Sequence, residues 1–293
     1  MNILLSGASG LVGTACSAEL RAAGHDVRLL NRGVGGEGLP WEVSTGRVNL
    51  QDFAPNALIH LAGENIAGGK WTEERMKKIR ASRVDATREL CDFLAKLEKP
   101  PEVMLSASAI GIYGPRGDKW ITEQTPNSTD FLGELCYEWE KATVELERVG
   151  CRVVHMRFGI ILSPNGGALK KMLPAFKMAL GGPMGDGRHW MSWIALEDVV
   201  RAISFLLDHA AAYGPINIVT PNPVTNAEFA ETLARVLKRP AFIRTPAGLL
   251  RMLFGDFVDA ALLSSQRVKP QRLTELGFEW RRPELEDALF SML

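Results

Sequence analysis

Residues 1–32 constrain the fold of this chain more than any other stretch does. They begin with a short apolar run, Asn2 to Leu5, which is typical of a buried parallel strand. A glycine-rich turn follows, and an alanine-rich stretch with apolar residues at helical spacing then runs from Gly10 to Gly24. Val27 to Leu30 has the pattern of a second strand. The order strand, glycine turn, helix, strand is that of a unit that binds a dinucleotide.

The glycines of this turn have separate physical roles. Gly7 permits the tight turn out of the strand, and Gly10 lets the backbone approach a pyrophosphate at the helix N-terminus. Gly13 lets the helix pack close to the sheet. The spacing is GxxGxxG rather than GxGxxG, but the turn follows a strand and begins a helix, which is the context that such a motif requires. The alternative is a glycine turn that binds nothing.

The end of the second strand indicates which dinucleotide is bound. Proteins that bind NAD place an Asp or Glu there to hold the ribose hydroxyls. This chain has Asn31 and Arg32 instead, and a guanidinium can bind a 2′-phosphate through two parallel hydrogen bonds. We therefore expect NADP(H), with Asn31 and Arg32 among its contacts. The alternative is that Arg32 is a solvated loop cation.

The amino-acid composition limits the classes of molecule that the protein is expected to bind. The chain of 293 residues has 34 basic and 34 acidic residues, so its net charge indicates neither a nucleic acid nor a membrane partner. No apolar run is long enough to span a membrane, and the N-terminus lacks the features of a signal peptide. The four cysteines show no disulfide-like or metal-binding spacing. We expect a cytoplasmic protein that acts on a small molecule and holds no metal.

The rest of the first half alternates between strands and helices. Three further strands are expected over residues 57–63, 103–108 and 151–158, and two long helices over residues 72–99 and 131–149. This pattern predicts an α/β fold with a Rossmann-like, doubly wound parallel sheet. His60 lies inside one of the apolar runs, and we expect a packed, hydrogen-bonded core residue there rather than a catalyst.

Beyond about Pro164 the pattern becomes irregular. We expect a nucleotide-binding domain over residues 1–164, to which a strand at 215–220 returns, and a smaller C-terminal α+β substrate lobe over residues 165–293. Thr225 and Glu228 form a capping box that predicts the start of a helix. Pro283 suits the first position of a last short helix.

Tyr137 and Lys141 form the most informative pair after the glycine turn. Residues at i and i+4 lie on the same helix face. An ammonium group beside a phenol favours the phenolate, so Tyr137 could serve as a general acid or base, and Lys141 could also bind the nicotinamide ribose. The preceding strand ends in Ser106 and Ser108, whose hydroxyls could polarise the same substrate oxygen. The alternative is a surface Tyr-Lys pair.

Together these motifs resemble the short-chain dehydrogenase/reductases. The resemblance rests on the glycine turn, the Leu61-Ala62-Gly63 strand end, the Ser106-Ala-Ser108 strand and the Tyr137-x-x-x-Lys141 helix. The long C-terminal half is similar to that of the extended, epimerase-like branch. Several longer stretches resemble an NAD(P)-dependent, epimerase-like subgroup with a C-terminal domain of unknown function, which would span about residues 245–293 here.

The resemblance implies a set of functional residues. It makes Ser108, Tyr137 and Lys141 catalytic, although the spacing from Ser108 to Tyr113 is longer than in an epimerase and leaves Ser106 as a rival. It also implies that the following residues contact the cofactor: Gly7, Ser9, Gly10, Leu11, Val12, Gly13, Arg32, Leu61, Ala62 and Gly63.

The sequence thus predicts an NADP(H)-dependent oxidoreductase of the extended short-chain type, acting on a carbonyl or hydroxyl group of an unidentified small molecule. Two alternatives stay open, a nucleotide-sugar epimerase and a non-catalytic regulator that binds NADP. The wider superfamily often dimerises through the two long helices expected here, but the first is heavily basic, so a homodimer and a monomer are both retained.

Overall fold

A seven-stranded parallel sheet forms the centre of the protein. The computed structural model describes residues 1–32, 38–255 and 257–293. The strands lie in the order β11-β7-β5-β4-β1-β2-β3, and each neighbouring pair is parallel. They are β1 (Asn2–Ser6), β2 (Asp26–Arg32), β3 (Leu39–Trp41), β4 (Ala57–His60), β5 (Val103–Ala109), β7 (Arg152–Phe158) and β11 (Gly214–Ile218). The chain builds outward from β1 in both directions, so a crevice for a ligand is expected beyond the carboxyl ends of β1 and β4.

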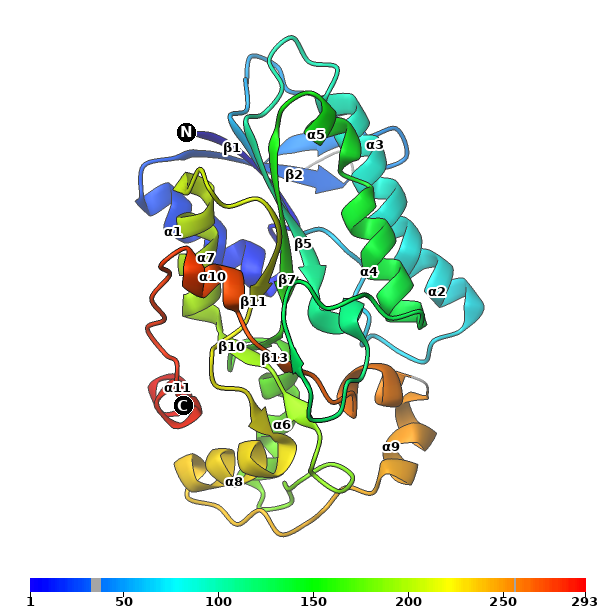
Figure 1. Ribbon diagram of the computed structural model, residues 1–293, viewed down its shortest axis with the longest axis vertical. Coiled ribbons are helices and arrows are strands. Elements are labelled where there is room, and N and C mark those ends of the chain that lie inside the picture. Colours follow the sequence, from blue (N-terminus) through cyan, green and yellow to red (C-terminus); the bar gives the residue numbers. More distant parts are fainter. Residues whose placement is uncertain (33–37, 256) are drawn as a thin grey trace.

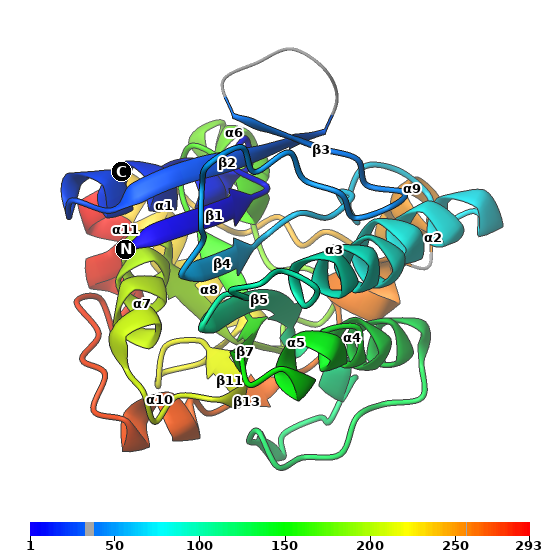
Figure 2. The ribbon, with the colours of Figure 1, turned by 90° about the horizontal axis from the view of Figure 1, so that it is seen from above.

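Helices cover both faces of this sheet, as Figures 1 and 2 show. On one side lie α1 (Leu11–Ala22) and α7 (Leu196–Asp208), and on the other α3 (Ala86–Leu94), α4 (Phe131–Lys141) and α5 (Val144–Arg148). Side chains of β1 alternate between the two layers, with Ile3 and Leu5 in the core that contains α1 and α7, and Leu4 in the core that contains α3. The predicted Rossmann-like, doubly wound fold is confirmed.

The two long helices expected from the sequence are both interrupted. The first is divided into α2 (Glu73–Arg80), the π-helical turn η1 (Ala81–Asp85) and α3. The second breaks after α4, and α5 begins at Val144. The strand expected near residues 215–220 is β11, which pairs with β7 at the edge of the sheet.

A second group of elements lies below the sheet in Figure 1, around a separate core that contains Trp193, Phe229 and Leu289. Its elements are β8 (Ile160–Leu162), α6 (Gly167–Lys177), β9 (Trp190–Met191), β10 (Trp193–Ala195), β12 (Val224–Thr225), α8 (Asn226–Leu237) and α11 (Leu285–Met292). The capping box at the start of α8 is confirmed. The placement of Pro283 was wrong, because α11 begins at Leu285 and Glu284 is its N-cap. The division into domains at residue 164 stays a prediction.

The C-terminal segment contacts both groups. It contains α9 (Ala247–Phe254), the π-helical turn η3 (Val258–Leu262), β13 (Arg267–Val268) and α10 (Gln271–Glu275). Strand β13 pairs with β6 (Trp120–Ile121), and Phe278 enters the core beside α7. A short 3₁₀ turn, η2 (Ile110–Tyr113), follows β5. Among the described residues, no helix has the length and apolar character required to cross a membrane.

Candidate functional site

The glycine turn is packed tightly between β1, α1 and the end of β4. Gly7 has a φ of +71°, and a methyl group on it would lie 2.6 Å from the carbonyl carbon of Leu61. A methyl group on Gly13 would lie 2.2 Å from the Gly7 carbonyl oxygen. Glycine is therefore required at both positions, and Gly10 is the N-cap of α1. The turn presents the backbone N–H groups and the positive end of the helix dipole to any ligand above it.

A cavity of about 440 Å³ lies against this turn. Six of the predicted cofactor contacts line it, namely Gly7, Gly10, Leu11, Val12, Gly13 and Leu61. The rest of the wall comes from Ala107 at the end of β5, from Phe158 to Ile161 after β7, and from the start of α6. The lining residues carry no charged side chain. Glycine backbone at one end and apolar walls at the other fit a dinucleotide, whose pyrophosphate needs the helix N-terminus and whose rings need apolar surface.

The other predicted cofactor contacts lie around this cavity. Ser9 is exposed in the turn, and Ala62 and Gly63 continue the chain from Leu61. Asn31 and Arg32 end β2, next to β1 in the sheet. The side chain of Arg32 lies outside the described part of the structure, so its contact with a 2′-phosphate stays a prediction.

His60 is a core residue, as the sequence predicted. Its ring is fully buried, with Ser6 Oγ 2.8 Å from Nδ1 and Thr87 Oγ1 2.9 Å from Nε2. Burial lowers the pKa of His60 to about 4, because desolvation penalises the charged imidazolium. The ring is therefore neutral at physiological pH and holds β1, β4 and α3 together.

Ser108 belongs to a buried polar network. Its hydroxyl donates to Glu140 Oε1 at 2.7 Å, and Arg157 binds both oxygens of that carboxylate at 2.8 and 2.7 Å. Arg157 also donates to the Tyr113 hydroxyl at 2.9 Å, and burial raises the pKa of Tyr113 to about 12. The charge of Arg157 is matched by Glu140, so Arg157 is not a free cation for a substrate.

Ser106 lies deeper in the sheet than Ser108. It is fully buried, and its hydroxyl donates to the Ala107 carbonyl oxygen at 3.4 Å. Ser108 is two residues nearer the carboxyl end of β5, where ligands bind in such sheets. The geometry therefore favours Ser108 over Ser106 as a serine that acts on a substrate. Ser108 does not line the cavity, but its neighbour Ala107 does.

Tyr137 and Lys141 lie together but away from the glycine turn. The Lys141 ammonium is 5.7 Å from the centroid of the Tyr137 ring, as the helical spacing predicted. Both side chains line a different cavity of about 380 Å³, whose wall also includes Glu140 and Arg157, and this cavity shares no lining residue with the cavity at the glycine turn. Tyr137 is 46% exposed. The expectation that this pair meets the nicotinamide thus finds no support in the geometry, and its catalytic role stays a prediction.

The orientation of α4 determines which of its residues reach the sheet. Cys136 and Glu140 are the i and i+4 residues that face the sheet, where Cys136 packs beside η2 and Glu140 accepts the Ser108 hydrogen bond. Tyr137 follows Cys136 by one residue, which is a rotation of about 100° around the helix axis. The sequence analysis missed Glu140, although its i+4 spacing from a buried apolar residue was a readable signal.

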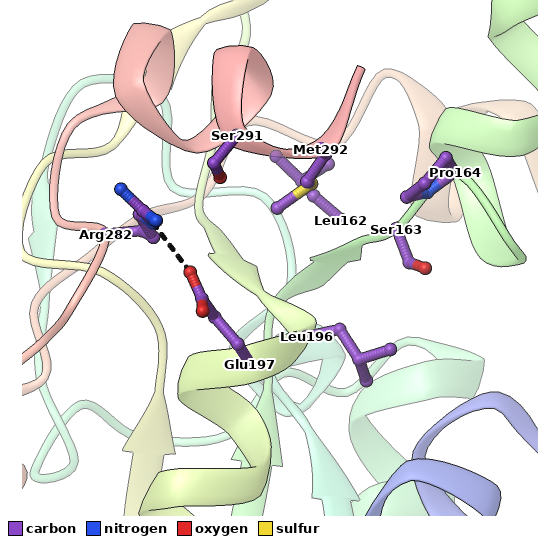
Figure 3. A pocket seen from close by; sticks show the side chains of 8 residues that line it. All are labelled: Leu162, Ser163, Pro164, Leu196, Glu197, Arg282, Ser291 and Met292. Atoms are coloured by element: carbon purple, nitrogen blue, oxygen red, sulfur yellow. Dashed lines mark hydrogen bonds and ion pairs between the residues drawn. The ribbon is translucent and has the colours of Figure 1, made fainter.

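A third cavity, of about 210 Å³, lies at the N-terminus of α7. Figure 3 shows that Glu197 and Arg282 line this cavity and point towards each other. The Arg282 Nε atom lies 2.7 Å from Glu197 Oε1. These charges neutralise one another, so the cavity offers no unmatched charge to a ligand. Within the described ranges, no group of three or more His, Cys, Asp or Glu residues could hold a metal ion.

Comparisons with known families match most of the chain in two parts. Residues 3–219 match the model of the NAD dependent epimerase/dehydratase family, and residues 245–291 match a domain of unknown function, DUF1731. An epimerase family protein of Mycobacterium bovis, Mb2239, is 38% identical, over 98% of this chain and 96% of its own length. The human epimerase family protein SDR39U1 is 34% identical, over 99% of this chain and 98% of its own length.

Solved structures of similar fold are also named as epimerase family proteins or epimerases. The crystal structure of human SDR39U1 (isoform 2) with NADPH aligns with a TM-score of 0.92 and 32% identity, covering 100% of this chain and 99% of that one. A structure named as the nucleoside-diphosphate sugar epimerase from Corynebacterium glutamicum aligns with a TM-score of 0.80 and 34% identity. It covers 100% of this chain and 58% of that one.

Proposed function

Because the chain belongs to the NAD dependent epimerase/dehydratase family, we propose that it is an NADP(H)-dependent oxidoreductase that transfers hydride between the nicotinamide and a carbonyl carbon. The observation that carries this proposal is the cavity at the glycine turn. Its glycines admit no side chain at Gly7 and Gly13, and α1 begins there, as a bound pyrophosphate requires. The human relative with a TM-score of 0.92 was crystallised with NADPH, which supports the same cofactor here.

The preference for NADP(H) over NAD(H) rests on Arg32. It stands at the end of β2, next to β1, where a carboxylate would repel a 2′-phosphate. A guanidinium instead attracts the phosphate and can bind two of its oxygens.

Proton transfer to the substrate oxygen is assigned to the end of β5. Ser108 is hydrogen-bonded to Glu140, so in alcohol oxidation the substrate hydroxyl could pass its proton through the serine to the Glu140 carboxylate, and in carbonyl reduction the proton would return from protonated Glu140 by the same path. This requires Ser108, which is only 3% exposed, to become accessible when substrate and cofactor are bound. Tyr137 and Lys141 are the competing assignment.

A second candidate function is a regulator that binds NADP(H) without turnover. The observation that favours it is that Ser108, Tyr137 and Lys141 do not line the cavity where the nicotinamide would lie. An oxidoreductase and a regulator share the cofactor site and differ only in chemistry, so turnover distinguishes them.

The test is NADPH oxidation by the wild-type protein, Ser108→Ala and Tyr137→Phe, with aldehydes, ketones, quinones and sugar nucleotides as substrates. We expect Ser108→Ala to lower the rate about 10²-fold or more, since positioned proton transfer contributes about 10²- to 10⁴-fold. Tyr137→Phe is expected to stay within about twofold of wild type, because no hydrogen bond among the described residues joins the Tyr137 hydroxyl to Ser108 or Glu140.

Two results would change the assignment. A loss of about 10²-fold in Tyr137→Phe, with unchanged NADPH affinity, would restore the Tyr137-Lys141 pair as the catalytic groups. Tight NADPH binding without oxidation of the cofactor by any carbonyl compound would favour the regulator. Interconversion of a sugar nucleotide without net redox change would identify an epimerase.

A further inference from the structure

Arg83 lies in the π-helical turn η1, which interrupts the long helical region after β4. Such turns occur frequently at functional sites. The neighbouring Ser82 fastens this turn to the loop after β4, because its hydroxyl accepts from the Glu64 N–H at 3.0 Å and donates to the Ile79 carbonyl oxygen at 2.9 Å. The turn therefore holds the Arg83 side chain in a defined place, beside the strand end that contributes Leu61 to the cofactor cavity.

The guanidinium of Arg83 lies between Gly63 and Trp139. A methyl group on Gly63 would be 3.1 Å from the Arg83 Cζ atom, and Cζ is 5.1 Å from the centroid of the Trp139 ring. Gly63 thus leaves room for a cation that crosses the end of β4. The indole face supports this cation from the α4 side.

The charge of Arg83 is only partly matched in the described part of the chain, where burial lowers its pKa and the Glu64 carboxylate, which is paired with Arg75, raises it. The side chain is half-buried, and its hydrogen bond among the described residues is a long one, 3.4 Å from Nη1 to the Ile79 carbonyl oxygen. In the described part of the chain it forms no ion pair, whereas Arg75 pairs with Glu64 and Arg80 pairs with Glu138. A guanidinium stays charged at neutral pH, so most of its N–H donors are available for a ligand.

The position of Arg83 along the sheet edge indicates which part of the cofactor it meets. The pyrophosphate site is at the end of β1, and β4 and then β5 follow at intervals of about 4.8 Å. Arg83 crosses the end of β4 and reaches Trp139 on α4, next to β5. Arg83 does not line the cavity itself, but its neighbours Val84 and Trp139 pack against Leu61, Ala107 and Phe158, which do. Arg83 therefore lies beside the half of a dinucleotide that extends from the glycine turn towards Ala107 and Phe158.

We infer that Arg83 binds the hydroxyl groups of the ribose that carries the nicotinamide. This inference rests on the proposed NADP(H) site. The planar guanidinium can donate to two neighbouring oxygens at once, which suits a ribose diol. Arg83 thereby takes the role that the sequence assigned to Lys141, whose ammonium lines the separate cavity beside Tyr137.

Calorimetric titration with two ligands tests this inference. NADPH contains the nicotinamide ribose, and adenosine 2′-phosphate 5′-diphosphate contains both phosphate sites but lacks this ribose. We expect Arg83→Gln to weaken NADPH binding about tenfold or more and to leave the affinity for the diphosphate within about twofold of wild type. Arg83→Lys keeps the charge but loses the planar fork, so it should weaken NADPH binding by about three- to tenfold.

The matched control is Arg80→Gln, which removes an exposed, ion-paired arginine from the preceding turn and should leave both affinities unchanged. Thermal unfolding of each variant without ligand shows whether the variant folds. If Arg83→Gln does not fold, the NADPH affinity of Arg83→Lys tests the inference instead. Equal NADPH affinity in wild type and the Arg83 variants would overturn the inference. Equal weakening of both ligands would also overturn it, since Arg83 would then bind the pyrophosphate. A wild type that does not bind NADPH would refute the proposed function itself.

Discussion

Gly7 and Gly24 both have positive φ angles, but their surroundings differ. A methyl group on Gly7 would collide with the Leu61 backbone, whereas a methyl group on Gly24 would have no neighbour within 4 Å. We expect Gly24→Ala to lower the free energy of unfolding by about 1 kcal/mol through backbone strain alone, and to retain NADPH binding. Gly7→Ala should cost at least about 2 kcal/mol and abolish NADPH binding. Urea unfolding measures the loss of stability, and NADPH titration measures the loss of binding. If the two variants had equal stability and equal NADPH affinity, the close contact between Gly7 and the Leu61 backbone would be contradicted.

His60 makes stability depend on pH. Its pKa is lowered from 6.5 to about 4 in the folded protein, so the unfolded chain binds the proton more readily. Its contribution to stability is complete above about pH 6.5 and is lost as the pH falls towards 4. Between pH 7 and pH 5 we expect wild type to lose about 2 kcal/mol more unfolding free energy than His60→Gln.

Urea unfolding at both pH values checks this difference. Burial also lowers the pKa values of His155 and His189, but both residues are present in the two proteins, so their contributions cancel. Parallel pH profiles for wild type and His60→Gln would show that His60 is not the buried neutral ring described here.

The sequence predicted some residue roles well and others poorly. The glycine turn was readable because each glycine is fixed by contacts within the strand–turn–helix unit itself. The Tyr137-Lys141 pair was correctly placed on one helix face, but the direction of that face was not readable. It depends on how α4 packs against η2 and β5, where Cys136 and Glu140 point inward. Glu140 and Tyr137 line the same cavity, but only the inward rotation of Glu140 brings it to Ser108.

At the scale of elements, the interruptions of helices were not predicted. The helix expected over residues 72–99 runs through residues 81–85 without a break, but the structure has a π-helical turn there, at which Ser82 contacts Glu64, 18 residues away in sequence. The break between α4 and α5 likewise lies at a tertiary contact, since Thr143 Oγ1 is 3.0 Å from His155 Nε2 on β7. The capping box at Thr225 was predicted because its two hydrogen bonds are local.

Helix α7 fixes the C-terminal segment through Asp198. This fully buried carboxylate accepts from the backbone N–H groups of Arg281 and Arg282, both at 2.8 Å. We expect Asp198→Ala to lower the free energy of unfolding by about 3 kcal/mol, because two backbone donors lose a buried, charged acceptor. Asp208→Ala, at the exposed end of the same helix, is the control and should cost less than about 0.5 kcal/mol. Limited proteolysis should then release the C-terminal segment from Asp198→Ala, and resistance equal to wild type would contradict this role.

At the scale of the whole molecule, the alternation of strands and helices sufficed to predict the doubly wound sheet. The same reasoning did not show that the C-terminal segment returns to the first half, where β13 pairs with β6 and Phe278 joins the core beside α7. Those contacts link residues that are far apart in sequence, and no local pattern encodes them. The cofactor cavity was predictable from one local unit, whereas the catalytic groups depend on several elements together.

The central claim is that the glycine turn binds NADP(H) in preference to NAD(H). Isothermal titration of the wild-type protein with NADPH and with NADH tests it most directly. We expect NADPH to bind at least about tenfold more tightly, which corresponds to about 1.4 kcal/mol, and Arg32→Ala to remove most of that difference. Equal affinities for the two cofactors, or a preference for NADH, would contradict the claim.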